Sequence, residues 1–507
     1  MMEPLEPSSL CSHGPFQSSR SSKWKPAANV KLACSARIGK DKGGVASFAC
    51  PAALSATATY LARTSRRRIS WWSARSLRAK SKAGETEESS EEFEEGQQNS
   101  QDSQRYSADE VQQNFFLMGV LFAMNHGVVT TPLAVSTTLL KLETATFGNG
   151  LLYVVTLFSS LLLGAPVVGQ LGPKGGLTFG MFFYCLYIAC FAGSLYFTSQ
   201  EWLFTAGSAC GGLAAGVLWT AQGTYFASSA SALSATGRSR DEATADLSGQ
   251  FAFSYLLLEV LSKLFFSVLQ AFGIDVWFIA ALYFLLAMLS LVLMQIWIYD
   301  LPSGDTNAAK PLDKALAAVS LWSDPAVWLL APTNLSFGFC AAYMNGFVNA
   351  RFAAAELGQE SVAFLGAITA LTAAFLAKAY GPLSSKVGKG SIISLGAGCA
   401  IAIPVLTYGG CSGWGWSLLS LYFLQGSVRA VYESTNRAIF SDFFPGQSEG
   451  AFANCMLQSS LGFATCFFLQ NSLSAEQLSG IIVGLALSTS LGYTAASSLK
   501  QVDSRGK

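Results

Sequence analysis

Gly381-Pro-Leu-Ser-Ser-Lys-Val-Gly-Lys-Gly390 is the stretch of this chain that says most about its fold. It is short and basic, begins and ends with glycine, and joins two long apolar runs. A degenerate copy, Gly169-Gln-Leu-Gly-Pro-Lys-Gly-Gly176, lies about 212 residues earlier. A loop that recurs at this spacing between apolar runs indicates a chain built from two related membrane-spanning halves.

The composition agrees with a membrane protein. Of the 507 residues, 51% are hydrophobic and only 12% are charged, whereas soluble domains carry about 25% charged residues. The net charge of +1 predicts no nucleic-acid partner, because the few charges are segregated along the chain. The 11 cysteines stand singly and there are only 2 histidines, so neither a zinc site nor a disulfide framework is indicated. Most of these cysteines lie in apolar runs and are expected to act as small apolar side chains.

Residues 1–110 form a polar leader. Residues 7–83 are basic and rich in Ser, Ala and Arg, whereas residues 85–95 are acidic because they contain a run of glutamates. Such a segment cannot bury enough apolar surface to fold and is expected to be disordered. A basic, hydroxyl-rich and acid-poor leader is also typical of an organelle transit peptide, and Val30-Lys-Leu-Ala-Cys34 resembles a plastid processing site. The alternatives are a plastid-targeting leader, a mitochondrial one and an ordinary cytosolic tail.

From residue 113 onward the chain contains about twelve apolar segments. Each is long enough to cross a hydrocarbon layer of about 30 Å. Because backbone polar groups in lipid must find partners within the segment, these spans are predicted to be helices. They cover residues 113–140, 147–170, 176–198, 202–227, 250–271, 276–299, 325–350, 360–383, 390–409, 414–440, 447–470 and 475–497.

Two polar connections interrupt this series. Residues 300–324 separate an N-terminal six-helix half, residues 111–299, from a C-terminal half, residues 325–498. A short tail, residues 499–507, follows. The other long connection, residues 228–249, contains Ser, Gly and charges of both signs. The predicted fold is therefore an all-α membrane protein of two six-helix halves with a disordered extension before it.

Basic residues in the loops set the orientation, because they gather on the cytosolic side of membrane proteins. With the N-terminus on the inner side, ten basic residues lie in inner loops or the tail: Lys174, Arg238, Arg240, Lys310, Lys314, Lys386, Lys389, Lys500, Arg505 and Lys507. The outer loops hold only Lys141 and Arg351. Both termini and both copies of the glycine-bounded loop are therefore predicted to lie inside.

The loop at Gly381–Gly390 resembles the cytoplasmic signature loop of the major facilitator superfamily, Gly-x-Leu-(small)-Asp-Arg-x-Gly-Arg-Lys, with Ser385 in the Asp position. The duplication shows again in the first helix of each half, where Met124-Asn-His-Gly127 of the first span has a counterpart in Met344-Asn-Gly346 of the seventh. The resemblance covers residues 112–497 and implies a polytopic carrier. The acid is missing from both loops, which puts a standard gating contact there in doubt.

Three further stretches resemble the Unc-ninety-three-like branch of that superfamily. They are Trp219-Thr-Ala-Gln-Gly-Thr-Tyr225 in the fourth span, Leu171-Gly-Pro-Lys174 after the second, and Glu449-Gly-Ala-Phe-Ala453 opening the eleventh. In the superfamily fold, spans 1, 4, 7 and 10 line a central cavity. The resemblance therefore implies substrate or coupling roles for Asn125, His126, Trp219, Gln222, Tyr225, Asn345, Asn349, Arg429, Tyr432 and Glu433. It implies gating roles for Gly169, Lys174, Gly381, Lys386, Gly388 and Lys389.

Charged residues within membrane spans are costly enough to be functional candidates. The tenth span carries Arg429, Glu433 and Arg437 at intervals of four, hence on one helix face. Arg437 lies near the inner end, where it can extend to the headgroups. The fifth span carries Glu259 and Lys263, also four apart. Each set is either a self-neutralising group that stabilises helix packing or part of a transport site.

Other polar residues leave two interpretations open. His126 has an ordinary pKa near 6.5, so it can couple transport to protons, or it can be a neutral histidine bonded to a neighbouring helix. Asn125, Asn345 and Asn349 can bind substrate or join helices. The small residues Gly207, Gly211 and Gly212 in the fourth span indicate close helix packing.

The sequence predicts no enzyme, no metal or cofactor site and no ATP hydrolysis, because no phosphate-binding loop occurs and the loops are too short for a catalytic domain. Two function classes are left. One is a secondary-active or facilitative transporter of a small solute, with the lipid bilayer, the solute and protons as its partners. The other is a non-transporting accessory protein, because animal members of the branch are known as channel-regulatory and receptor-escort proteins. Charges retained in the predicted cavity favour transport.

Overall fold

The computed structural model describes residues 107–197, 199, 201–301, 318–445 and 447–506. Within these ranges it is helical and has no strand. Eleven of its helices are long and apolar enough to cross a membrane, which confirms the all-α membrane fold. Residues 1–106 of the leader predicted at 1–110, and most of the linker predicted at 300–324, lie outside the described residues. Residues 107–110 form the cap and first turn of a helix.

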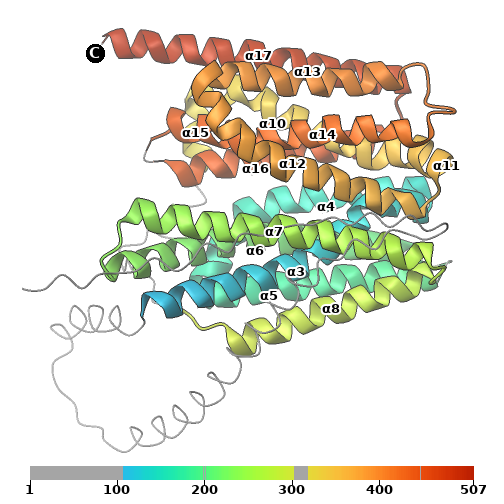
Figure 1. Ribbon diagram of the computed structural model, residues 1–507, viewed down its shortest axis with the longest axis horizontal. Coiled ribbons are helices and arrows are strands. Elements are labelled where there is room, and N and C mark those ends of the chain that lie inside the picture. The colour runs from blue at the N-terminus through green and yellow to red at the C-terminus, as the bar shows by residue number, and fades with distance from the viewer. Residues whose placement is uncertain (1–106, 198, 200, 302–317, 446, 507) are drawn as a thin grey trace, which may run out of the picture. The chain divides into compact units, whose positions relative to one another are not determined.

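The helices fall into two halves, which Figure 1 shows in blue to green and in yellow to red. The N-terminal half consists of α3 (Ala108–Leu139), α4 (Leu142–Leu162), α5 (Gly164–Tyr196), α6 (Trp202–Ala235), α7 (Arg240–Ala271) and α8 (Val276–Trp297). The C-terminal half consists of η1 (Leu321–Ser323), α10 (Pro325–Tyr343), η2 (Met344–Ala353), α11 (Ala354–Leu357), α12 (Glu360–Val387), α13 (Lys389–Thr407), η3 (Gly415–Leu418), α14 (Leu419–Val431), η4 (Tyr432–Asn436), α15 (Arg437–Phe443), α16 (Ser448–Leu469) and α17 (Ala475–Gly506). We call the side on which α3 begins and α17 ends the inner side; it lies at the left of Figure 1.

Several helices begin where the sequence supplies a cap. Ser107 and Glu110 form a reciprocal capping box at the start of α3, which satisfies backbone N–H groups that lack partners within the helix. The Ser239 hydroxyl accepts from the Glu242 N–H at the start of α7. Asp324 caps α10, whose first residue is a proline, the position where a missing N–H costs nothing.

The tenth span is one helix in three pieces, α14, η4 and α15. The middle piece, η4, is a π-helical turn, and the span carries four charged side chains, Arg429, Glu433, Arg437 and Asp442. Together with the eleven apolar helices it completes the twelve spans predicted from the sequence. A second π-helical segment, η2, lies in the seventh span. Such segments are rare and recur at functional sites.

The prediction of a long connection at 228–249 is wrong. Helix α6 continues to Ala235 and α7 begins at Arg240, so the loop is only a few residues long. Hydroxyls within this end of α6 donate back to carbonyls one turn earlier, as Ser229 does to Tyr225 and Ser234 to Ala230. Serine can therefore be accommodated in a helix that leaves the membrane.

The two glycine-bounded loops turn at different positions. In the first copy the backbone reverses at Gly172, whose φ is 73°; in the second it reverses at Gly388, whose φ is 86°. Positive φ values favour glycine over any other residue. The first turn thus comes three residues after Gly169, and the second comes seven after Gly381, so the copies are related in sequence but not in turn position.

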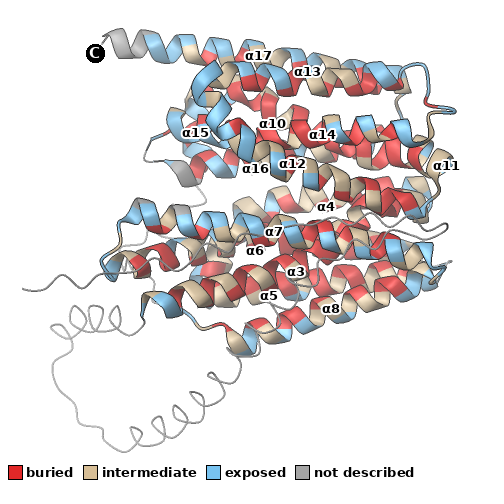
Figure 2. Ribbon diagram, in the orientation of Figure 1, coloured by how far each residue is buried: buried red, intermediate tan, exposed pale blue. Residues whose placement is uncertain are grey.

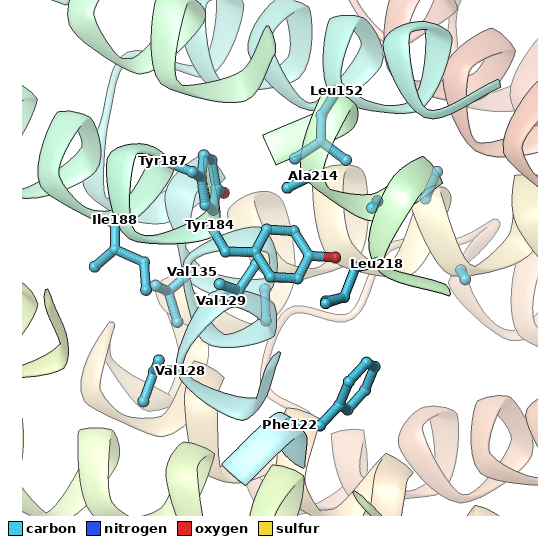
Figure 3. Close-up of a cluster of buried hydrophobic side chains, with 14 of the residues drawn as sticks. Phe122, Val128, Val129, Val135, Leu152, Tyr184, Tyr187, Ile188, Ala214 and Leu218 are labelled. Carbon is cyan, nitrogen blue, oxygen red and sulfur yellow. The ribbon is translucent and has the colours of Figure 1, made fainter. Parts of the chain in front are cut away.

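The buried residues follow the helix faces that meet inside each half, and exposed ones lie along the outer faces (Figure 2). In the N-terminal half, side chains of α3, α4, α5 and α6 interlock, among them Phe122, Leu152, Tyr184, Tyr187 and Leu218 (Figure 3). Many large apolar side chains are exposed instead. In water such a surface would be a liability; in a bilayer it contacts lipid.

Glycine allows α6 to pack closely against its neighbours, as the sequence predicted. A Cβ at Gly212 would lie 2.3 Å from the Leu152 carbonyl oxygen of α4. At Gly207 it would lie 2.5 Å from the Cβ of Cys190 in α5. Because a backbone atom cannot move aside, the α4–α6 contact requires glycine at position 212.

We predict that Gly212→Ala destabilises the protein by about 1–3 kcal/mol, the usual cost of overpacking. The matched control is Gly223→Ala in the same helix, where a Cβ would meet nothing within 4 Å. Thermal unfolding of the detergent-solubilised full-length chain compares the two. Equal melting temperatures for both variants would contradict the close packing of α4 on α6.

Candidate functional site

Five alternating charges connect the two halves inside the membrane. In α7, the Lys263 Nζ lies 2.6 Å from the Glu259 Oε1. From the other half, Arg429 of α14 donates to both oxygens of the same carboxylate, at 2.8 and 2.7 Å. Glu259 is 2% exposed and Arg429 is 15% exposed. Two parallel N–H···O bonds between ionised groups are among the strongest that proteins make.

The tenth span continues the series toward the inner side. The Arg437 guanidinium lies 2.8 Å from Glu433, and the Nε of Arg429 lies 4.0 Å from the other oxygen of Glu433. We call Lys263, Glu259, Arg429, Glu433 and Arg437 the charge ladder. Exposure rises along it, to 28% for Glu433 and 44% for Arg437. The ladder therefore runs from a closed interior toward the inner side.

Helix periodicity places the α7 members of the ladder. Glu259 and Lys263 are four residues apart and lie on one face of α7, and contacts to the C-terminal half occur there. Besides the Glu259 pair, a Cβ at Gly366 of α12 would contact the Lys263 side chain, and the Ser267 hydroxyl donates to the Glu360 carbonyl. This face of α7 forms part of the seam between the halves.

His126 lies in an aromatic cage one layer behind the ladder. Its ring centroid is 5.9 Å from Phe122, 5.7 Å from Tyr184, 5.4 Å from Trp219 and 5.3 Å from Tyr255. His126 is 7% exposed, and its Nε2 is 3.2 Å from the Tyr255 hydroxyl. The histidine is thus packed in the N-terminal half and reaches the seam through Tyr255.

Two of the predicted cavity residues join helices of the N-terminal half. The Asn125 amide donates to the Ala287 carbonyl and to the Ser290 hydroxyl of α8. The Tyr225 hydroxyl donates to the Tyr299 carbonyl at 2.7 Å. Both side chains are fully buried, so their contacts fit the helix-joining interpretation.

Asn345 and Asn349 lie in the seam, at its outer end. The Asn349 amide donates to the Ala134 carbonyl at 2.9 Å, and its oxygen accepts from Tyr422 at 2.6 Å. Asn345 contributes its backbone carbonyl, which accepts from Thr137 at 2.6 Å. These residues hold α3 against the seventh span.

The remaining predicted residues lie in the fourth and tenth spans. Trp219 and Gln222 of α6 are half-buried. Tyr432 is buried; its ring stacks on Phe337 at 4.0 Å between centroids and its hydroxyl lies 3.1 Å from that of Ser459. Tyr432 is therefore a packing residue of the C-terminal half beside the ladder.

The predicted gating loops make contacts within their own halves. The Lys174 Nζ donates to the Gln295 carbonyl at the end of α8, and Lys389 pairs with Asp442 of α15. Ser385, in the position of the family's acid, donates to the Pro382 carbonyl at 2.8 Å. Gly169, Gly381, Lys386 and Gly388 lie at the same inner turns. Gating roles for these residues stay predictions.

No group of three or more His, Cys, Asp or Glu side chains within the described ranges is placed to hold a metal. The described cysteines are unbridged, and Cys185, Cys340, Cys411, Cys455 and Cys466 are buried. These five behave as the small apolar side chains that the sequence predicted.

Sequence reasoning found the ladder's members but not the pairing of Glu259 with Arg429, which are 170 residues apart. It also missed Tyr255, which has no charge and no motif. One signal was available: Tyr255 is four residues before Glu259 and shares its helix face.

The ladder predicts unequal effects of removing its charges. Glu259→Gln leaves Lys263 and Arg429 side by side without their carboxylate, and is expected to cost about 3–5 kcal/mol. Arg429→Gln leaves two complete pairs, Lys263–Glu259 and Arg437–Glu433, and is expected to cost far less. Thermal unfolding in detergent at neutral pH compares the variants. Equal losses of stability would show that the ladder is not coupled as the distances indicate.

Comparison with known proteins gives consistent matches. The family model described as ion channel regulatory protein UNC-93 matches residues 144–245. Protein unc-93 homolog A of Bos taurus is 25% identical over 404 residues, which cover 68% of this chain and 84% of the relative. The Danio rerio protein of that name is 28% identical over 161 residues, 31% of this chain and 34% of its own length.

Solved structures of transporters share the fold. The nucleoside transporter NupG superimposes with a TM-score of 0.56 at 13% identity, covering 76% of this chain and 98% of that one. The xylose transporter XylE from E. coli, in an inward open conformation, gives a TM-score of 0.54 at 14% identity over 76% and 95% of the two chains.

Proposed function

We propose that this chain, an UNC-93-like membrane protein with the major facilitator fold, is a secondary-active or facilitative transporter that moves a small solute by alternating access. In such a cycle two halves rock about a central site. The observation that carries the proposal is the ion pair between Glu259 and Arg429, which joins the halves inside the membrane.

The energetic argument concerns where the charges lie. An ionised residue at membrane depth is expensive to keep, and such residues mark ion or substrate pathways. A purely structural contact between two halves is made more cheaply by apolar side chains. Here five charged side chains lie along the seam, and two of them, Glu433 and Arg437, are partly exposed. A solute that reaches Arg429 or Glu433 can replace one of the ion pairs of the charge ladder.

The seam also has the asymmetry of one state of a two-state carrier. Hydrogen bonds between described residues of the two halves occur at the ladder and in an outer group. The outer group pairs Thr137 with Asn345, Asn349 with Ala134, Gln359 with Thr138, Asn471 with Thr146, and Ser267 with Glu360. All five lie toward the outer ends of their helices. Neutral hydrogen bonds of this kind contribute about 1 kcal/mol each, so the outer group can break when a solute favours the other state.

His126 and Glu433 are the candidates for proton coupling. Glu433 is partly exposed between two arginines. The His126 Nε2 lies 3.2 Å from the Tyr255 hydroxyl, so a change in the protonation of His126 would reach the ladder by way of that hydroxyl. We propose Glu433 as the group that faces solute and protons directly.

Transport predicts a specific phenotype for Arg429→Gln. The variant is expected to fold but to lose at least about tenfold in rate, the equivalent of 1.4 kcal/mol of lost coupling. The measurement is solute counterflow and proton movement, reported by an internal pH dye, in proteoliposomes offered sugars, organic acids, amino acids, nucleosides and inorganic anions.

The control is Lys378→Gln, which removes a charge at an exposed position of α12 and is expected to transport normally. An Arg429→Gln rate equal to that of the unaltered protein would contradict the proposed role of the pair.

The second candidate function is that of a non-transporting accessory protein that regulates or escorts another membrane protein. The description of the matching family model, ion channel regulatory protein, favours it. It predicts that no solute in the panel gives counterflow, and that Arg429, Glu433 and His126 can be replaced without loss of function. Counterflow of one solute, lost in Arg429→Gln, would exclude it as the sole function.

The membrane in which the protein works is a further part of the proposal. The basic, hydroxyl-rich composition of residues 7–83 supports the plastid envelope, although this leader lies outside the described residues. We predict that a fluorescent fusion of residues 1–110 enters plastids. Fluorescence confined to the cytosol would exclude organelle targeting and leave the plasma membrane or an endomembrane.

A further inference from the structure

The charge ladder carries an excess positive charge. Lys263, Arg429 and Arg437 are three cations, and Glu259 and Glu433 are two carboxylates. Glu259 is shared by two cations, whereas Glu433 contacts Arg437 closely and Arg429 only at 4.0 Å. Since an unbalanced charge is costly at membrane depth, the partly exposed end of the ladder favours a ligand with a negative charge.

A second feature lies beside the ladder, on α7 and the neighbouring helix α6. Trp219, Phe251 and Tyr255, which we call the aromatic wall, pack together with ring centroids 5.5, 5.9 and 6.3 Å apart. All three are half-buried, whereas Phe122 behind them is fully buried. The wall thus closes the cage of His126 and leaves aromatic surface uncovered.

The wall and the ladder meet at Tyr255. Tyr255 precedes Glu259 by one helical turn, about 5.4 Å along the axis. An uncovered aromatic surface and an excess positive charge therefore lie within the length of a small organic molecule, on opposite sides of the seam.

We infer that the solute is an organic anion with an aromatic ring, whose ring packs on Trp219, Phe251 and Tyr255 while its charged group binds the Arg429–Arg437 end of the ladder. This inference rests on the proposed transport function and names its substrate class. Ring stacking on the wall is favourable in offset or edge-to-face geometry. A guanidinium has five N–H donors, so Arg437 can bind a carboxylate, sulfonate or phosphate while keeping its contact with Glu433.

Other ligand classes fit only one of the two features. A ring-bearing cation would be attracted by the aromatic faces but repelled by the net charge of the ladder. A small anion without a ring would leave the aromatic wall uncovered. A neutral ring would gain nothing from the arginines. The combination of ring and negative charge uses both features.

The test is equilibrium dialysis of radiolabelled naphthalene-2-sulfonate against the full-length chain in lipid nanodiscs. Three competitors separate the features: methanesulfonate has the charge without the ring, naphthalene-2-sulfonamide has the ring without the charge, and benzyltrimethylammonium has a ring with the opposite charge. We expect saturable binding, with each competitor at least about tenfold weaker than unlabelled naphthalene-2-sulfonate, because each lacks an interaction of about 1.4 kcal/mol.

Matched variants locate the site. Phe251→Leu is expected to weaken binding about threefold to tenfold, the contribution of one aromatic contact. Its control is Phe253→Leu, two residues away in α7 and 66% exposed, which should bind normally. Arg437→Gln is expected to weaken binding at least about tenfold, and Lys378→Gln should not.

The inference is overturned if the protein binds no naphthalene-2-sulfonate, if a competitor binds as tightly as that probe, or if Phe251→Leu and Phe253→Leu have the same affinity. Counterflow in proteoliposomes distinguishes a failure of this inference from a failure of the proposed transport function. Counterflow of a sugar, a nucleoside or an inorganic anion without binding of the aromatic sulfonate would overturn the substrate class and leave transport in place. Binding without counterflow of any solute would support the site and contradict transport.

Discussion

The bidentate pair between Glu259 and Arg429 is the interaction around which the rest of the seam is arranged. It lies in the membrane interior, is almost fully buried, and joins helices from different halves. Breaking it in lipid without replacing its partners would leave two unpaired charges, at a cost of several kcal/mol. The flanking charges reduce that cost, because Lys263 can keep Glu259 neutralised and Glu433 can take up Arg429. The ladder therefore allows the halves to separate without leaving a bare charge.

The surrounding structure divides into parts that are fixed and parts that can change. Within each half, glycines allow helices to pack closely, as Gly212 of α6 does against α4. Buried hydrogen bonds also join helices, as between Asn125 of α3 and Ser290 of α8. These contacts make each half a rigid unit. Between the halves there are single hydrogen bonds at the outer end and ion pairs in the middle. Aromatic rings of α4 and α16 also stack across the seam, as Tyr153 does on Phe463 with ring centroids 4.2 Å apart. Rigid units joined at a narrower seam are what rocking motion requires.

Much of the fold could be predicted from the sequence, because apolar length decides a membrane helix and loop charge decides its orientation. The predicted spans 202–227 and 250–271 are shorter than α6 and α7, because both helices continue at their inner ends, to residue 235 and from residue 240. The site was harder to predict. Spacing of four revealed each ion pair within a helix, but which faces meet across the seam depends on helix tilt and on the π-turn at η4, which no local pattern encodes.

The most direct test of the central claim is a distance measurement between spin labels at the inner ends of α6 and α12, on exposed positions Ala235 and Ser385, in a background without reactive cysteines. If the Glu259–Arg429 pair stabilises the arrangement described above, the measured distances fall into two populations. Arg429→Gln is then expected to decrease the fraction of molecules in the population with the longer distance. A single population that is identical in both proteins would contradict the account, because the halves would then form one rigid body that the pair does not control.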